Sequence, residues 1–294
     1  MRPLYCFIDD SPFELALFQD IFPKAIPGVE FICASSFNDC KQILDGRSIY
    51  PSLFILDLYG GAQENAGVSI PAKAELEART QKFLNLNHVY QDLESIPDDL
   101  KINEFLKRLF TIVSDWRELF ADVCQTVGQG RHYGIENLQQ VKKHYPMAGV
   151  VFYTRKAIFP DALALNRLGC FDIFMKPPGR NNEEIRIKTQ EQSQGLIAQW
   201  NETVRKNYII EFEGQLIKKE TENGWPIAFN SEAITLINIM KNLSKPDLSI
   251  ETELKRIFGA QPSIFDVVFD IPAPFIEGFK VWLAFYYDID ISKI

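Results

Sequence analysis

The sequence has few of the residues that build zinc sites or disulfide frameworks. Its 294 residues include five cysteines and three histidines. The cysteines are odd in number and scattered, so we expect reduced thiols and a cytoplasmic protein. The histidines, His88, His132 and His144, share no ligand spacing, which disfavours a zinc centre.

The chain also lacks an excess of basic charge, a long apolar run and a glycine-rich phosphate loop. Its net charge is -8, whereas a general nucleic-acid binder needs a basic face, so we expect no nucleic-acid partner. No apolar run approaches the length that spans a bilayer, so we expect no membrane partner. No glycine-rich loop follows the first predicted strand, which disfavours nucleotide binding.

Short apolar runs alternate with helical patterns in two parts of the chain, before about residue 60 and after about residue 133. Each run is apolar on both faces, which is typical of a strand in the middle of a parallel sheet. The strands are expected at residues 4–8, 29–33, 53–56, 149–153 and 170–175. Ser11 and Glu14 form a capping box around Pro12, which predicts a helix after the first strand. The alternation predicts an α/β fold with helices on both faces of the sheet.

The alternation breaks between about residues 63 and 132, where we expect helices and no strand. The segment from 98 to 127 carries an apolar face at helical spacing, made of Ile102, Phe105, Leu106, Leu109, Val113, Trp116, Phe120 and Val123. This face either packs on the chain's own elements or docks a partner protein, and both uses bury the same residues.

The last part of the chain, residues 207–294, shows no motif that assigns a function. Its pattern is mixed and largely helical, and its charge is acidic. We find no helix-turn-helix with a basic recognition helix in it. We therefore expect an effector or interaction region whose output is protein binding.

Five polar residues follow buried strands directly. They are Asp9, Asp10, Asp57, Thr154 and Lys176. In an open parallel sheet, ligands bind beyond the carboxyl ends of the strands, so these side chains are expected to meet at one edge. Each one alone is most often a turn former, a helix cap or a solvated charge. Their joint placement at successive strand ends predicts one site.

Phosphoryl transfer to a carboxylate is the chemistry that suits this group. The three carboxylates of Asp9, Asp10 and Asp57 make a hard oxygen site for Mg²⁺, which is the expected cofactor. The metal offsets repulsion between Asp57 and an incoming phosphate, and Lys176 adds a positive point charge. The Thr154 hydroxyl can donate to a phosphoryl oxygen. No other nucleophile or base is required, so we expect a phosphoacceptor and not an enzyme with a separate substrate.

Four segments resemble the signature segments of bacterial response-regulator receiver domains: Phe7-Ile8-Asp9-Asp10-Ser11, Ile55-Leu56-Asp57-Leu58, Phe152-Tyr153-Thr154 and Phe174-Met175-Lys176-Pro177. The resemblance implies a flavodoxin-like fold with a five-stranded parallel sheet in the order 2-1-3-4-5. It implies phosphorylation of Asp57 by a histidine kinase or phosphotransfer protein, in a phosphorelay of two-component signal transduction. It also implies that the Tyr59 carbonyl is a further Mg²⁺ ligand.

The resemblance covers only part of the chain and departs from the family at several positions. It predicts a receiver domain of residues 1–62 and 133–206, a helical insertion of residues 63–132, and a separate region of residues 207–294 that acts on a downstream protein. Tyr59 and Arg155 are large where water reaches the phosphorylated Asp in this family, so we expect slow hydrolysis of the phosphoryl group.

Two other functions stay open from the sequence. The chain is either a degenerate receiver that serves as a constitutive protein-interaction module, or a metal-dependent phosphatase with an Asp nucleophile. The second reading is weaker, because that class usually has a second Asp two residues after its nucleophile, and Asp9-Asp10-Ser11-Pro12 lacks this spacing.

Overall fold

A computed structural model gives a five-stranded sheet as the centre of the fold. It describes residues 1–47, 49–61, 70–155, 164–224, 231–242, 248–259, 264–267, 269 and 271–289. The strands are β1 (Leu4–Ile8), β2 (Glu30–Ala34), β3 (Leu53–Leu56), β6 (Gly149–Thr154) and β7 (Asp172–Met175). Their order is β2-β1-β3-β6-β7, and every pairing is parallel. Numbered within this sheet, the order is 2-1-3-4-5, so the predicted fold class is confirmed.

The side chains of alternate strand residues pack in two separate apolar cores, one on each face of the sheet. Tyr5 and Phe7 of β1 lie in one core, and Cys6 and Ile8 lie in the other. Successive side chains of a strand point to opposite faces, so a run that is apolar throughout buries both faces. This is the physical reason why the continuous apolar runs became central strands.

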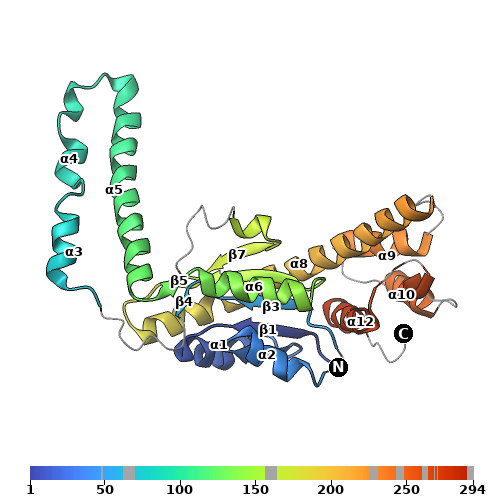
Figure 1. The fold of residues 1–294 in the computed structure, drawn as a ribbon. Coiled ribbons are helices and arrows are strands. Elements are labelled where there is room, and N and C mark those ends of the chain that lie inside the picture. Colours follow the sequence, from blue (N-terminus) through green and yellow to red (C-terminus); the bar gives the residue numbers. More distant parts are fainter. Residues whose placement is uncertain are drawn as a thin grey trace. The chain divides into compact units, whose positions relative to one another are not determined.

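Helices cover both faces of the sheet (Figure 1). Helices α1 (Pro12–Ala25) and the first part of α8 (Asn182–Asn223) lie on one face, and α2 (Phe37–Leu44) and α6 (His132–His144) lie on the other. Trp200 of α8 is fully buried and stacks on Phe18 of α1, with 5.9 Å between ring centroids. The doubly wound arrangement therefore follows from apolar stripes on four helices.

The predicted capping box at the start of α1 is only half formed. The Ser11 hydroxyl accepts a hydrogen bond from the Glu14 N–H at 3.4 Å. The Glu14 carboxylate does not return to the cap; it bonds to Arg155 instead. A guanidinium within reach is a stronger partner for a carboxylate than a backbone N–H.

The described residues fall into two compact units, Met1–Tyr59 with His132–Ile294, and Gly60–Arg131. The second unit contains β4 (Gly60–Gly61), α3 (Lys73–Thr80), α4 (Leu86–Tyr90), a 3-10 turn (Leu93–Ser95), α5 (Asp98–Thr126) and β5 (Gln129–Gly130). β4 pairs antiparallel with β5. The sequence gives no sign of this ladder, because each strand has only two residues and three of the four are glycine. The predicted boundary at residue 62 lies outside the described residues.

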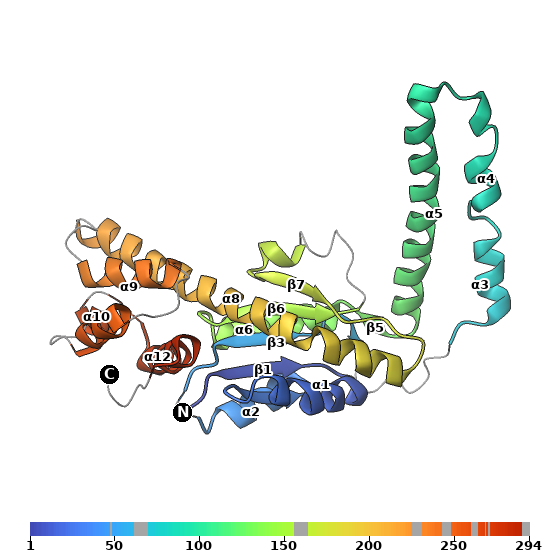
Figure 2. The same ribbon diagram turned by 180° about the vertical axis from the view of Figure 1, so that it is seen from behind.

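Helix α8 continues without a break to Asn223, so the boundary expected at residues 206 and 207 falls inside it (Figure 2). Tyr208, Phe212 and Leu216 repeat every four residues on its buried face and extend the helix past the sheet. It ends at Gly224, which has the positive φ of 64° that glycine adopts without strain.

The described residues after α8 include the helices α9 (Ser231–Lys241), α10 (Leu248–Gly259), α11 (Ile264–Val267) and α12 (Ala273–Tyr287). Phe212 of α8 packs on Phe279 of α12, with 4.7 Å between ring centroids. The described part of this region is helical and belongs to the same compact unit as the sheet. Among the described residues, no helix is both long enough and apolar enough to cross a lipid bilayer.

Candidate functional site

The sheet brings the predicted site residues to one edge. Asp9 follows the last residue of β1 and Asp57 follows the last residue of β3. Thr154 ends β6 and pairs with Met175, so Lys176 comes one residue beyond it. Because the strands are parallel and in register, their carboxyl ends reach the same edge.

Three carboxylates gather there. Asp9, Asp10 and Asp57 each place an oxygen so that the three oxygens lie within 4.8 Å of one another. Asp9 and Asp57 are buried, and Asp10 is partly exposed. Like charges this close repel strongly where water is scarce, so the cluster needs positive charge from elsewhere.

Lys176 supplies part of that charge. Its buried ammonium contacts Asp9 Oδ2, and it donates a hydrogen bond to Asp57 Oδ1 at 2.8 Å. It also lies 3.8 Å from Glu14 Oε2. Burial alone would lower the pKa of this ammonium, but the charges of Asp57, Asp9 and Glu14 outweigh burial and raise the pKa. Lys176 is therefore a permanent cation at the site.

Backbone groups fix the orientation of two carboxylates. The Ser11 N–H donates to Asp9 Oδ1 at 2.9 Å, and the Tyr59 N–H donates to Asp57 Oδ2 at 3.0 Å. Burial still raises the pKa of Asp9 to about 6; Lys176 opposes the shift and the charge of Asp57 adds to it. Asp9 thus holds its negative charge near neutral pH at an energetic cost.

Thr154 is the last residue of β6, and Tyr59 comes two residues after Asp57. Thr154 is fully buried, and its carbonyl accepts the backbone N–H of Lys176 at 3.0 Å. The Tyr59 side chain is buried. The roles expected for the Thr154 hydroxyl and the Tyr59 carbonyl stay predictions.

Glu14 and Arg155 form a second ion pair at this edge. Arg155 Nη1 lies 2.5 Å from Glu14 Oε1, and Arg155 Nε donates to the Pro177 carbonyl at 3.1 Å. The Glu14 side chain is 8% exposed. From the sequence, Glu14 was expected only to cap the helix. Its position in the first turn of the helix after Asp10 was the available signal, because side chains there point back toward the helix N-terminus.

Gly134 and Tyr133, at the start of α6, complete the surroundings of Asp57. The Gly134 N–H donates to the Leu58 carbonyl at 3.1 Å, and a Cβ at Gly134 would lie 2.6 Å from the Asp57 carbonyl oxygen. The Tyr133 hydroxyl donates to the Ser35 carbonyl at 2.7 Å. Burial and then the charges of Asp9 and Asp10 raise the pKa of Tyr133. Tyr133 therefore stays a neutral hydroxyl beside the carboxylates.

The donor set fits a Mg²⁺ ion. Mg²⁺ takes oxygen ligands at about 2.1 Å, so oxygens on opposite sides of it lie about 4 Å apart. The spacing of up to 4.8 Å between the Asp9, Asp10 and Asp57 oxygens is close to this.

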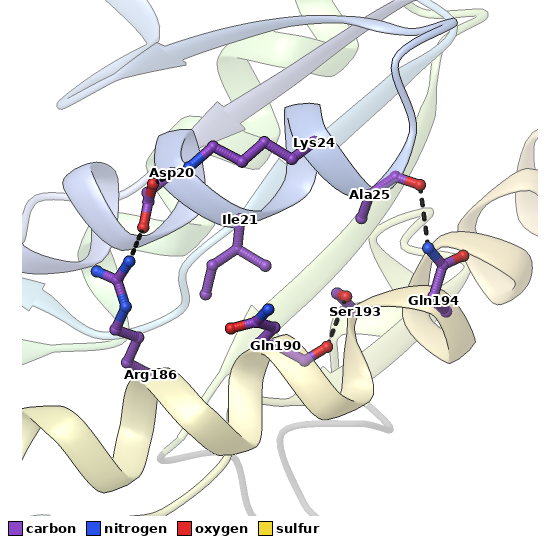
Figure 3. Close-up of a pocket in the computed structure, with 8 residues that line it drawn as sticks. All are labelled: Asp20, Ile21, Lys24, Ala25, Arg186, Gln190, Ser193 and Gln194. Atoms are coloured by element: carbon purple, nitrogen blue, oxygen red, sulfur yellow. Dashed lines mark hydrogen bonds and ion pairs between the residues drawn. The ribbon is translucent and has the colours of Figure 1, made fainter.

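A separate hollow of about 310 Å³ lies between α1 and α8 (Figure 3). Its charged and polar groups pair with their neighbours: Arg186 with Asp20, and the Gln194 amide with the Ala25 carbonyl at 3.1 Å. This pairing leaves the carboxylate cluster as the stronger candidate for chemistry.

Comparisons with known proteins give matches only among solved structures. No protein-family model matches the chain, and no curated protein matches it. A signal receiver domain of a putative Luxo repressor protein from Vibrio parahaemolyticus is 15% identical, with a TM-score of 0.34; the match covers 71% of this chain and 95% of that one. A response regulator receiver domain protein from Clostridium thermocellum is 14% identical, with a TM-score of 0.31; the match covers 66% and 98%.

RcsB from Salmonella enterica serovar Typhimurium, bound to promoter rprA in the presence of the phosphomimetic BeF3-, is 12% identical with a TM-score of 0.30. The match covers 87% of this chain and 100% of that one. At such identities the matches concern the fold alone, and the fold rests on the strand order of the sheet itself.

The expectation that nucleic acid is excluded as a partner was wrong, because a matched response regulator is bound to promoter DNA. The physical error lies in the use of net charge. A charge of -8 is a sum over the whole chain, whereas DNA contact needs basic residues only on one local face. An acidic chain therefore does not exclude such a partner.

Proposed function

We propose that the chain is a response regulator whose receiver accepts a phosphoryl group on Asp57 from a histidine kinase, with Mg²⁺ as cofactor. The observation that carries the proposal is the group of three carboxylate oxygens within 4.8 Å, with Lys176 bonded to two of the carboxylates. The phosphoryl group then switches a protein–protein interaction. The chain has no other catalytic role in this proposal.

In the proposed step, a carboxylate oxygen of Asp57 attacks phosphorus. A new O–P bond forms as the bond between phosphorus and the donor nitrogen breaks, and the nitrogen keeps the electron pair. Lys176, 2.8 Å from Asp57 Oδ1, is placed to neutralise charge on the phosphoryl oxygens. The Thr154 hydroxyl, at the end of the neighbouring strand β6, would donate to a phosphoryl oxygen.

Asp9, Asp10, Asp57 and the Tyr59 carbonyl would hold Mg²⁺, which shields the negative charge that Asp57 and the phosphate bring together. The chain's own residues supply the rest. The Tyr59 N–H holds Asp57 Oδ2, and the Ser11 N–H holds Asp9 Oδ1. Both hydrogen bonds keep the carboxylates oriented before the donor arrives.

Incubation with a small phosphodonor and Mg²⁺ tests the proposal. Intact-mass analysis should find one added phosphoryl group on the wild type, none on Asp57→Asn, and none on the wild type with excess chelator. Asp45→Asn is a matched control, because Asp45 is an exposed carboxylate at the end of α2.

The same experiment separates the alternatives. No adduct on the wild type would support a degenerate receiver that acts as a constitutive interaction module. Sustained release of phosphate from a phosphomonoester would support an Asp-dependent phosphatase. An equal adduct on wild type and Asp57→Asn would refute the assignment of Asp57.

A further inference from the structure

Helix α5 of the second unit carries an apolar stripe that its own unit does not cover. The stripe comprises seven residues, called here the α5 seam: Ile102, Leu106, Leu109, Val113, Trp116, Phe120 and Val123. Ile102 is 70% exposed and Trp116 is 54% exposed. Phe110, 62% exposed, lies beside the seam. An exposed apolar surface of this size marks an interaction site.

The neighbouring helices of the unit contact mainly another side of α5, and within the seam the Phe83 ring meets Trp116 with 5.8 Å between ring centroids. α3 and α4 lie alongside it (Figure 2). Phe105 meets Tyr90 of α4 with 5.6 Å between ring centroids, and Arg108 Nη1 donates to the Gln91 carbonyl at 2.6 Å. Arg79 of α3 pairs with Asp122 at 2.6 Å. These contacts fix the hairpin and leave most of the seam exposed.

The spacing of the seam indicates what covers it. Its seven residues follow one another at intervals of four and three in strict alternation, which is a heptad repeat. A stripe with this repeat can stay in contact over its full length, about 33 Å for 22 residues, with another helix of the same repeat. A second copy of this chain supplies an identical stripe through a symmetric interface.

The area is sufficient for a stable pair. Six exposed residues on this side of α5, Ile102, Leu106, Phe110, Val113, Trp116 and Phe120, are 40% to 70% exposed. At about 100 Å² each, two copies would bury about 1,200 Å² in total, which reaches the size of specific interfaces. α5 carries six acidic and four basic residues, so two copies would meet without strong repulsion.

We propose that the chain self-associates through the α5 seam, so that two α3–α5 hairpins form a four-helix bundle. A two-helix layer cannot bury both of its faces, and pairing with a second copy buries the exposed one. The association needs no phosphoryl group and no metal, so it stands independently of the function proposed above.

Sedimentation equilibrium of the full chain in chelator, without phosphodonor, tests the proposal. The wild type should have twice the mass of one chain at low micromolar concentration. Val113→Glu and Phe120→Glu place a charge in the seam and should weaken association at least tenfold. Ser114→Glu adds the same charge to the next residue, outside the seam, and should associate like the wild type.

Circular dichroism checks that each variant keeps its helices, and the second seam variant covers the case in which the first does not fold. A wild type that is monomeric at every concentration would overturn the proposal, as would a dimer that both folded seam variants retain.

Discussion

Replacement of Asp9 by asparagine should stabilise the metal-free protein at pH 7. Asp9 is buried, and its pKa is raised to about 6 from an ordinary 3.8. A difference of about two pKa units corresponds to about 3 kcal/mol of unfolding free energy lost when the carboxylate is charged. Asparagine keeps an oxygen that can accept the Ser11 N–H but carries no charge. We expect a gain of about 1 to 3 kcal/mol.

The change leaves no cation without a partner. Lys176 keeps its hydrogen bond to Asp57 at 2.8 Å and its proximity to Glu14 at 3.8 Å. The usual penalty for breaking a buried ion pair, which comes from an uncompensated charge, therefore does not apply in full.

The raised pKa of Asp9 makes the stability gain of Asp9→Asn depend on pH. The folded-state pKa of Asp9 lies above the unfolded value, so the folded state binds the proton more tightly. The cost of the charged carboxylate is fully present above about pH 6 and disappears as the pH falls from 6 toward 3.8. The stability advantage of Asp9→Asn should be largest at pH 7 and should shrink as the pH approaches 4.

Urea unfolding in chelator, followed by circular dichroism between pH 4 and 7, measures this advantage. Asp45→Asn, which changes an exposed carboxylate, should change stability little at any pH. Mg²⁺ should stabilise the wild type more than Asp9→Asn, because the variant loses a ligand. An Asp9→Asn protein that is less stable than wild type at pH 7, or an advantage that does not vary with pH, would refute the reasoning.

Three further substitutions follow from the contacts of the site and its support. Lys176→Met leaves Asp9 and Asp57 without their cation and should destabilise the metal-free protein by roughly 3 to 5 kcal/mol in urea unfolding, with partial recovery in Mg²⁺. Gly134→Ala places a methyl group 2.6 Å from the Asp57 carbonyl oxygen and should cost about 2 kcal/mol by the same assay and slow phosphodonor labelling. Gly195→Ala, where the added methyl meets nothing within 4 Å in α8, is its matched control and should stabilise by up to about 1 kcal/mol.

The sheet and the edge cluster were predictable because their signals are local. A strand buried on both faces is a continuous apolar run, and a polar residue directly after it has only one edge of the sheet to occupy. Asp9, Asp57 and Lys176 obey this rule, and Thr154 is itself the last residue of its strand. The strand order came from the family resemblance.

The long-range pairings and the boundaries were not predictable in the same way. The bond from Glu14 to Arg155 joins residues 141 positions apart. The residues near Glu14 give no local signal that it pairs with Arg155, and the same holds for those near Arg155. The uninterrupted α8 was not predicted, because the residues that resemble a known family end near residue 206 and the helix runs on to Asn223 with Gly214 inside it. Net charge misled the exclusion of nucleic acid because it averages over surfaces that act locally.

The Glu14–Arg155 pair balances charge at the edge of the sheet that carries the carboxylate cluster. Four carboxylates, Asp9, Asp10, Asp57 and Glu14, share this edge with two cations. If Arg155 were small, Glu14 would add an uncompensated negative charge beside Lys176. With Arg155 present, the edge keeps two net negative charges, which one divalent cation neutralises. The guanidinium is bonded to the Pro177 carbonyl through Nε and to Glu14 through Nη1, and its buried Nη2 has no hydrogen-bond partner among the described residues. If Asp57 accepts a phosphoryl group as proposed, we therefore expect Arg155 to keep its bond to Glu14 and to offer Nη2 to a phosphoryl oxygen.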